Sequence, residues 1–459
     1  AAAHLIARGV PVTIFEAASR VGENIRDWGH VRLFSVWDQC IDQAAAGLLE
    51  RHGWKRPEGS SLPTGGELVK DYLEPLAATP EIARSLKLDA RVTRVSRAGL
   101  DRMSNKERGT RPFVLRIESA NGRSERVAAR AVIDASGTWQ HPNPAGPGGW
   151  HADGERENAS RIAYGIPDIG GTRRADYAGK RTLVLGGGHS AANALLDLAL
   201  LAESAPGTRL TWAVRGTSLA KVFGGGESDQ LPARGALGAR LRALTTAGRL
   251  ETVTGFTLEA IEKAGEAMLV TGTVDDKARQ LGLFDRIIVA TGQRPGFEFA
   301  RELQLDLHPV VESSRALGPL IDPNEHSCGT VPPHGWRELA HPEPDYFIAG
   351  IKSYGRAPTF LLLTGYEQVR SVAAHLAGDH AAADDVRLVL PETGVCNATL
   401  EQVAPGGLCC DGAAPDAAEP CCERPPEAAK TACCSGPAPQ ARTACCGVSR
   451  KEAELAGVI

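Results

Sequence analysis

Cysteine is scarce over most of this sequence, although the 459 residues include eleven cysteines. Only Cys40 and Cys328 precede residue 396. A secreted domain held together by disulfides needs several cysteine pairs within its fold, so the composition excludes that class for the body of the chain. A large core without such pairs is typical of the reducing cytoplasm, and we expect a cytoplasmic protein.

Long hydrophobic runs and an excess of one charge are also missing. No stretch approaches the roughly 20 apolar residues that cross a membrane, and a formal net charge of −4 does not favour nucleic acid as a partner. The first residues, AAAHLIARGVPV, contain no basic segment and no cleavage site of a secretory signal. They are typical of the second half of a helix that enters a strand, so we expect residues to be missing before Ala1.

The pattern of apolar segments predicts an α/β fold. A first series has expected strands at 10–17 and 130–137, with antiparallel strands between them. A second series contains an expected helix at 190–202 and expected strands at 182–185, 210–216 and 284–295. The two series echo each other, because VTIFE matches LTWAVR and VIDASG matches IIVATG. This duplication predicts two Rossmann-like (doubly wound) dinucleotide-binding domains.

The same pattern predicts the domain boundaries. We expect a first domain at 1–150 that is completed by 330–390, and a second domain at 175–300 that is inserted into the first. Residues 391–459 differ, because 401–448 within them are rich in Ala, Pro and Gly and show no helix or strand period. Such a segment cannot bury enough apolar surface to offset its ordering entropy, so we expect a disordered tail.

A glycine-rich turn opens the second domain. The string GGGHSA places Gly186, Gly188 and Ala191 in a Gly-x-Gly-x-x-Ala fingerprint between an expected strand and an expected helix. The first glycine permits the tight turn, the second lets the backbone approach a pyrophosphate, and the alanine allows close packing of helix on strand. The helix that begins near Ser190 directs its N-terminus toward the phosphates. The alternative is a glycine-rich turn in another kind of α/β protein.

The residues that end the next strand of each domain indicate the nucleotide. In the second domain this residue is Arg215, whose guanidinium pairs well with a 2′-phosphate, which favours NADPH over NADH. In the first domain it is Glu16, at the position where an acid binds an adenosine ribose. Together they predict FAD in the first domain and NADPH in the second. The alternatives are a solvated surface arginine and a strand-end carboxylate without a ligand.

Two short turns recur after later strands, one in each half of the chain. Ala135, Ser136 and Gly137 form the first turn, and Thr291 and Gly292 belong to the second. Glycine allows the backbone to come close to a bound nucleotide, so we expect both turns at the cofactor sites.

These motifs carry a family resemblance. Residues 1–377 resemble flavoproteins with two dinucleotide-binding domains, that is, flavin monooxygenases and the thioredoxin reductase group. Within them, GGGHSA, the stretch IAGIKSYGRAPTFLLLTGYEQVRSVAAHLAG and the cysteine-rich end resemble flavoprotein monooxygenases encoded in arsenic-resistance operons. The resemblance implies an FAD site formed by Glu16, Arg20, Ala135, Ser136, Gly137 and Gly350. It implies an NADPH site formed by Gly186, Gly188, Ser190, Ala191, Arg215, Thr291 and Gly292.

The identity of the electron acceptor follows from the cysteines of the body. A disulfide reductase needs a redox pair such as Cys-x-x-Cys against the flavin, and Cys40 and Cys328 share no such motif. We therefore expect oxygen and a small-molecule substrate as the reaction partners. Because the flavin carries the chemistry, no catalytic triad is needed. Lys352 and Arg356 in KSYGR are the candidates for catalytic side chains in the flavin pocket, and a purely structural loop is the alternative.

The remaining cysteines form a repeat near the C-terminus. Pairs recur every 12 residues, at Cys409, Cys410, Cys421, Cys422, Cys433, Cys434, Cys445 and Cys446. Thiolates are soft ligands for thiophilic ions, and As(III), which prefers three sulfurs, is a candidate ligand, with Cys396 as an additional donor. Several pairs on one chain raise the local thiol concentration. The alternative is a low-complexity end without a selected role.

The sequence therefore predicts an FAD- and NADPH-dependent oxidoreductase, a monooxygenase linked to arsenic handling, with a thiol-rich tail that binds metalloid. Two other hypotheses stay open. One is an NADPH-dependent thiol or metal(loid) reductase whose C-terminal cysteines shuttle electrons. The other is a non-enzymatic metalloid-binding protein on a flavoprotein body. The substrate and the oligomeric state are left open.

Overall fold

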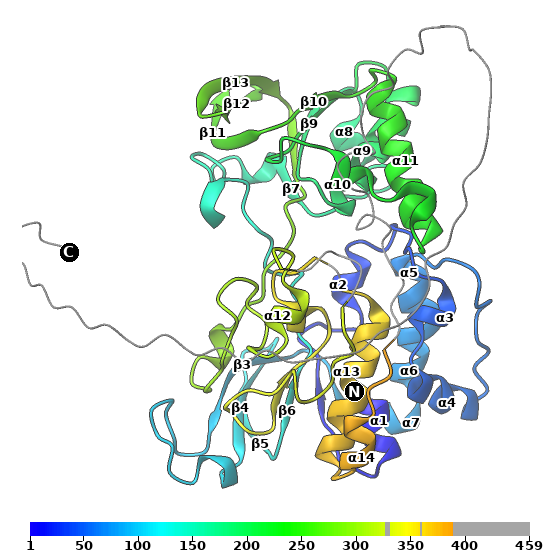
Figure 1. The fold of residues 1–459 in the computed structure, drawn as a ribbon, viewed down its shortest axis with the longest axis vertical. Helices are drawn as coiled ribbons and strands as arrows, with labels where there is room; N and C mark the ends of the chain where they lie inside the picture. The colour runs from blue at the N-terminus through cyan, green and yellow to red at the C-terminus, as the bar shows by residue number, and fades with distance from the viewer. Residues whose placement is uncertain (326–330, 359, 389–459) are drawn as a thin grey trace, which may run out of the picture. The chain divides into compact units, whose positions relative to one another are not determined.

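The computed structural model describes residues 1–325, 331–358 and 360–388 of the chain. Within this part, parallel strands alternate with helices in two domains (Figure 1), so the predicted α/β fold with two Rossmann-like domains is confirmed. The expected tail at 391–459, with its cysteine pairs and Cys396, lies outside the described residues, as does Cys328.

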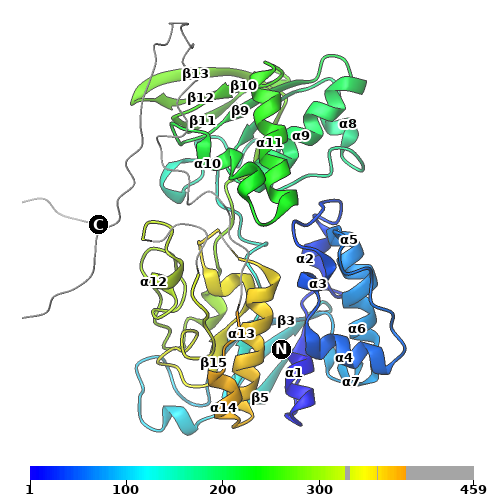
Figure 2. The same cartoon turned by 45° about the vertical axis from the view of Figure 1, so that its right-hand side comes forward.

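The first domain combines two pairs of parallel strands, β1 with β2 and β6 with β15, and an antiparallel sheet in the order β3-β4-β5. Its strands are β1 Ile14–Phe15, β2 Leu86–Lys87, β3 Ala90–Arg97, β4 Phe113–Ser119, β5 Ser124–Ala129, β6 Val132–Asp134 and β15 Tyr346–Ile348. Its helices are α1 Ala2–Ala7, α2 Glu23–Arg26, α3 Trp37–Cys40, α4 Gln43–Arg51, α5 Gly65–Leu68, α6 Glu74–Ala78, α7 Pro80–Ala83, α12 Gly318–Ile321, α13 Leu362–Leu376 and α14 His380–Asp384. Helices α1 and α13 lie side by side in both ribbon views (Figure 1, Figure 2) and share one apolar core with β15.

The second domain is built on a parallel five-stranded sheet in the order β10-β9-β8-β14-β7. Its strands are β7 Ile162–Tyr164, β8 Arg181–Leu185, β9 Arg209–Ala213, β10 Glu251–Val253, β11 Phe256–Ala264, β12 Ala267–Val274, β13 Lys277–Phe284 and β14 Arg286–Val289. Its helices are α8 Arg174–Tyr177, α9 His189–Ser204, α10 Ala220–Phe223 and α11 Pro232–Thr246. Because β7 belongs to this sheet, the domain extends in front of the expected range 175–300.

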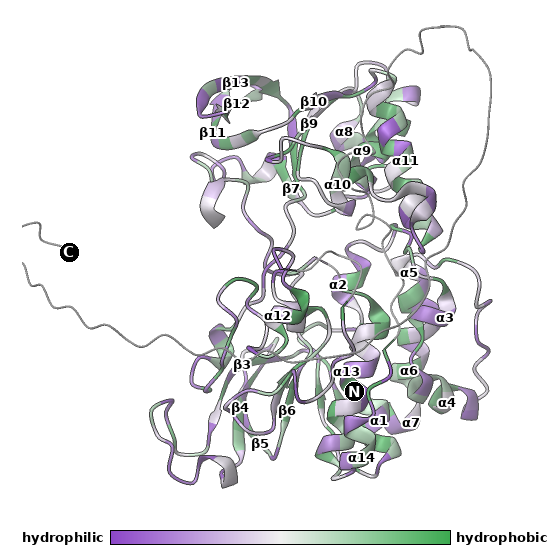
Figure 3. Ribbon diagram, in the orientation of Figure 1, coloured by the Kyte–Doolittle hydropathy of each residue, from purple (hydrophilic) through white to green (hydrophobic). Residues whose placement is uncertain are grey.

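Burial on both faces explains the apolar strands of the second domain. Along β8, Val184 packs in the core shared with α9, while Leu183 and Leu185 pack in the core shared with β11 and β12. Successive side chains of a strand point to opposite faces, so one short strand serves both cores. Figure 3 shows hydrophobic colour near β9, the neighbour of β8 in this sheet.

The two domains differ at the centre of their sheets. In the second domain, β8 lies between β9 and β14. Trp212 of β9 and Ile287 of β14 are fully buried. By the sequence duplication, β1 corresponds to β9 and β6 corresponds to β14. Among the described residues no strand lies between β1 and β6, and Phe15 and Ile133 are only partly buried. The first-domain counterpart of the glycine loop is therefore absent from the part of the chain that the structure describes.

The expected strands are longer than those in the structure: β6 Val132–Asp134 replaces 130–137, β9 Arg209–Ala213 replaces 210–216, and β14 Arg286–Val289 replaces 284–295. The first strand of the chain differs most. Instead of 10–17, only Ile14–Phe15 pairs with a neighbour. Pro11 lacks an N–H group to donate to a ladder, and β2 is the one strand that pairs with β1 among the described residues. Within the described ranges, no helix has both the length and the apolar content that crossing a bilayer requires.

Candidate functional site

The glycine loop of the second domain lies at the carboxyl end of β8. Gly186 has a φ of +129°, and a Cβ built on it would come within 2.2 Å of the Ala290 carbonyl oxygen. A Cβ on Gly188, by contrast, would meet no atom within 4 Å. Gly186 is therefore required for packing of the loop on the turn after β14, whereas Gly188 leaves open space in front of the backbone.

Trp212, which the sequence analysis missed, binds the glycine loop through a hydrogen bond. The indole Nε1 of Trp212 donates a hydrogen bond of 2.8 Å to the Gly186 carbonyl, and the Trp212 side chain is fully buried. Ala191 is also fully buried, so α9 packs closely on the sheet as the fingerprint requires. Ser190 lies partly exposed in the first turn of the helix. The N-terminus of this 16-residue helix and the open loop together suit an anionic pyrophosphate.

Arg215 follows β9 and is exposed. The structure shows no hydrogen bond or ion pair between Arg215 and any residue that it describes. Its guanidinium is therefore available to a ligand near the glycine loop, as the predicted contact with a 2′-phosphate requires.

Replacing Arg215 with alanine tests this contact. A charge-assisted hydrogen bond contributes about 1.5–3 kcal/mol, so we expect the preference for NADPH over NADH in kcat/KM to fall by about 10- to 100-fold. Arg279→Ala removes another exposed arginine, on β13 of the same domain, and is the matched control. An unchanged ratio in Arg215→Ala would contradict the 2′-phosphate role.

The second turn is tied to the segment that enters the second domain. The Nδ2 of Asn143 donates to the Thr291 carbonyl at 3.0 Å, and the Thr291 hydroxyl donates to the Asn143 carbonyl, also at 3.0 Å. The Asn143 N–H donates to the Gly292 carbonyl at 2.9 Å, where Gly292 has a φ of +85°. This reciprocal pairing fixes the turn beside the glycine loop.

The corresponding turn of the first domain follows β6. Ala135 and Ser136 are exposed, and Gly137 has a φ of +75°. Gly350, which follows β15, has a φ of +71°, and its N–H donates to Gln368 Oε1 at 3.0 Å. Because β6 and β15 are parallel neighbours, the two turns lie at the same edge of the sheet.

Glu16 and Arg20 follow β1 at the end of its short ladder. The Glu16 carboxylate accepts a hydrogen bond of 2.9 Å from the Ala18 N–H and is partly buried. Arg20 pairs with Glu23 at 2.5 Å, and the Arg20 side chain is 56% exposed. Glu16 directly follows the strand as the sequence predicted, and the contacts of Glu16 and Arg20 with a nucleotide stay a prediction.

Each of the two catalytic candidates, Lys352 and Arg356, forms an ion pair with a carboxylate of the same chain. Lys352 is buried, and its Nζ lies 2.8 Å from Asp134 Oδ2. Arg356 pairs with Glu312 at the surface. The catalytic role of these residues stays a prediction. Asp134 was missed by the sequence analysis, although it ends the strand in VIDASG.

Several solved structures have a fold similar to that of this chain. The chain is similar to the bacillithiol disulfide reductase Bdr (YpdA) from Bacillus cereus, with a TM-score of 0.58 and 18% identity over 82% of this chain and 94% of that one. It is also similar to DfoA bound to FAD, the cadaverine monooxygenase from Erwinia amylovora, with a TM-score of 0.57 and 12% identity over 85% and 95%. Thioredoxin reductase from T. acidophilum gives 0.50 and 13% over 83% and 94%. Neither a protein-family model nor a curated protein sequence matches the chain.

The chain therefore shares its fold with these two reductases and with the FAD-bound monooxygenase. In this fold, the open space at Gly188 and the exposed Arg215 fit NADPH. For FAD, the first domain offers the Glu16 carboxylate after β1, the exposed residues Ala135 and Ser136 after β6, and the partly buried turn at Gly350 after β15. An acid and two glycine turns at strand ends fit an FAD site.

Cys40, the cysteine in the described part of the chain, lacks the environment of a reactive thiol. Cys40 is fully buried, its Sγ donates to the Ser35 carbonyl at 3.5 Å, and burial raises the pKa of its thiol to about 12. A thiol with such a pKa is almost entirely protonated at neutral pH and is a poor nucleophile. Among the described residues, no three His, Cys, Asp or Glu side chains are grouped so that they could hold a metal ion.

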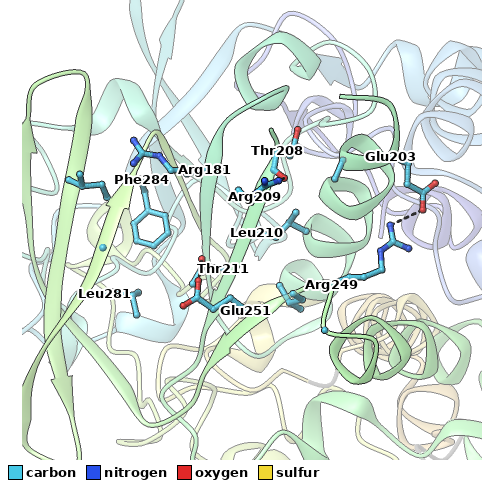
Figure 4. A pocket seen from close by; sticks show the side chains of 15 residues that line it. Arg181, Glu203, Thr208, Arg209, Leu210, Thr211, Arg249, Glu251, Leu281 and Phe284 are labelled. Carbon is cyan, nitrogen blue, oxygen red and sulfur yellow. Dashed lines mark hydrogen bonds and ion pairs between the residues drawn. The ribbon is translucent and has the colours of Figure 1, made fainter. Parts of the chain in front are cut away.

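A cleft of about 640 Å³ lies at the opposite edge of the second domain's sheet (Figure 4). It is lined at the amino ends of β8 and β9 by Arg181 and Arg209, and Glu203 pairs with Arg249 beside it at 2.9 Å. The glycine loop follows the carboxyl end of β8. This cleft is therefore separate from the glycine loop.

Proposed function

We propose that the chain is an FAD- and NADPH-dependent oxidoreductase that acts as a monooxygenase on a small-molecule substrate. The observation that carries the proposal is an open glycine loop beside an exposed Arg215, in a body that holds no cysteine pair. The similarity in fold to a cadaverine monooxygenase supports it, and the similarity to disulfide reductases keeps the second hypothesis in view.

The residues of the chain bind and orient the cofactors in this proposal. The loop 186–191 and the N-terminus of α9 receive the pyrophosphate of NADPH, and Arg215 receives its 2′-phosphate. Glu16, the turn 135–137 and Gly350 hold FAD. The chemistry that FAD supplies when bound is the transfer of electrons from NADPH to oxygen. Cys40 takes no part, because its thiol is buried and protonated.

Oxygen dependence of NADPH oxidation tests the enzyme class. We expect the FAD-loaded protein to oxidise NADPH in air and to slow by at least about tenfold under argon, since Cys40 and Cys328, the cysteines that precede residue 396, share no Cys-x-x-Cys motif that could take the electrons. The measurement is absorbance at 340 nm together with oxygen uptake. Anaerobic turnover at the aerobic rate onto a disulfide or a metal ion would instead favour a reductase that uses the C-terminal cysteines.

We further propose that the paired cysteines at 409–446 bind As(III) or another thiophilic ion. Thiolates favour soft ions, and the repeat raises their local concentration. Arsenite is titrated into the reduced full chain and into a chain that ends at Gly394. We expect the full chain to bind more arsenite per molecule, and equal binding by both would contradict the proposal.

A further inference from the structure

A buried ion pair joins the two turns of the first domain. Asp134 ends β6, and Lys352 lies in the 3-10 helix Gly350–Tyr354 that follows β15. The Lys352 Nζ is 2.8 Å from Asp134 Oδ2, with side-chain exposures of 1% and 2%. The register of the parallel strands places Ile348 opposite Asp134, so the pair crosses from one strand end to the next.

Both members of the pair also hold Ser136. Asp134 Oδ1 accepts hydrogen bonds from the Ser136 N–H at 3.0 Å and from its hydroxyl at 2.7 Å. The Lys352 Nζ lies 3.1 Å from the same hydroxyl oxygen. Tyr346 donates to the remaining carboxylate oxygen at 3.1 Å. The turn 135–137 therefore contacts two charged groups through Ser136. One is the Asp134 carboxylate, which precedes the turn, and the other is the Lys352 ammonium, which follows β15.

The second half of the connection runs through Gln368 of α13. Its side-chain oxygen accepts from the Gly350 N–H at 3.0 Å, and its Nε2 lies 2.8 Å from the Ser353 hydroxyl. Two aromatic rings lie against the ammonium of Lys352. Its Nζ is 4.6 Å from the ring centroid of Phe299 and 5.3 Å from that of Phe297. The helical turn that bears Lys352 is thus held by Gln368 through Gly350 and Ser353, and the ammonium of Lys352 lies against Phe299 and Phe297.

Stability alone does not account for such a pair. Replacing a buried ion pair with apolar groups of similar volume is often neutral or stabilising, because desolvation of both charges offsets their attraction. The second domain offers a comparison. There Asn143 holds the turn at Thr291, and no buried charge is needed. The charges in the first domain instead connect Ser136 of the turn 135–137 with Lys352 of the turn that follows β15.

We propose that Asp134 and Lys352 form a clamp that fixes the turn 135–137 relative to the turn at Gly350, so that both are positioned for FAD. This inference rests on the proposed function. It makes Lys352 a positioning residue, because its ammonium is enclosed by Asp134, Ser136 and two rings. It also assigns a role to Asp134, which the glycine motifs do not include.

The test compares the full chain with Asp134→Asn, Lys352→Met and the double substitution. Each single change leaves one buried charge without its partner, so we expect a lower melting temperature, and the double change should recover most of that loss. We expect the dissociation constant for FAD to rise on the order of tenfold in all three variants. Amide exchange of residues 134–137 should also be faster in the double variant without FAD.

The matched control is Asp229→Asn with Arg234→Met, which removes a shielded ion pair of 2.7 Å from the second domain. This change should leave the affinity for FAD as it is. A double variant at Asp134 and Lys352 that binds FAD like the parent, with unchanged exchange at 134–137, would overturn the clamp. A parent chain that binds no FAD would contradict the proposed function, and amide exchange would still decide about the clamp.

Discussion

Gly186→Ala is expected to destabilise the second domain by about 3 kcal/mol. The added Cβ would come within 2.2 Å of the Ala290 carbonyl oxygen, so the backbone of the loop or of the turn after β14 must move. Overpacking of a tight contact costs about 1–3 kcal/mol, and a positive φ on a residue other than glycine adds of order 1 kcal/mol. Urea unfolding measures the change.

Gly188→Ala is the matched control two residues along the same loop. Gly188 has a φ of −101°, and a Cβ there meets nothing within 4 Å, so the fold tolerates it. We expect a loss of stability below about 1 kcal/mol, since alanine is a poorer N-cap than glycine. We also expect about tenfold weaker binding of NADPH, because the methyl group enters the space that the pyrophosphate needs. Equal unfolding of both variants would contradict the assignment of Gly186 to packing.

Glu343→Gln is expected to have the second large effect on stability. Glu343 accepts from Arg97 Nε at 2.7 Å and from Arg108 NH2 at 2.6 Å, and its side chain is fully buried. Removing the charge leaves two buried guanidinium groups without a counter-ion. Breaking a buried pair costs about 3–5 kcal/mol, a large part of the 5–15 kcal/mol that stabilises a typical protein.

The control for this variant is Asp306→Asn. Asp306 pairs with Arg315 at 2.9 Å, but the side chains are 41% and 54% exposed, so water screens the pair. An exposed pair contributes about 0–1 kcal/mol, and we expect a correspondingly small change in the urea midpoint. A similar loss in both variants would show that burial of Glu343 does not set its contribution.

The pH dependence of the Glu343 variant follows from the sign of its pKa shift. Burial by itself would raise the pKa of Glu343, but the hydrogen bonds from Arg108 and Arg97 outweigh burial and hold it below the ordinary value. A lowered pKa stabilises the fold above the unfolded value of about 4.3 and loses this contribution as the pH falls through the folded value. The difference between parent and variant should therefore be full at pH 7 and shrink below about pH 4.

Apolar periodicity and turn residues in the sequence predicted the main elements of the second domain around the glycine loop. Helix α9 and strand β8 lie within a few residues of the expected ranges, and Gly186 occupies the tight turn that the fingerprint required. Turn chemistry and apolar periodicity are encoded by neighbours in the chain, so they are readable without a fold. The first domain was less predictable, since β1 depends on its pairing with β2 and comprises two residues.

The sequence by itself determined the two-domain α/β plan, the glycine loop and the shortage of cysteine in the body. Tertiary structure alone decided which side chains support the site. Asp134 meets Lys352, Trp212 meets the Gly186 carbonyl, and two arginines enclose one glutamate, all across chain separations that no local pattern records. Such contacts form only when distant segments pack, because a buried charge or donor takes whatever partner the fold brings within hydrogen-bond distance.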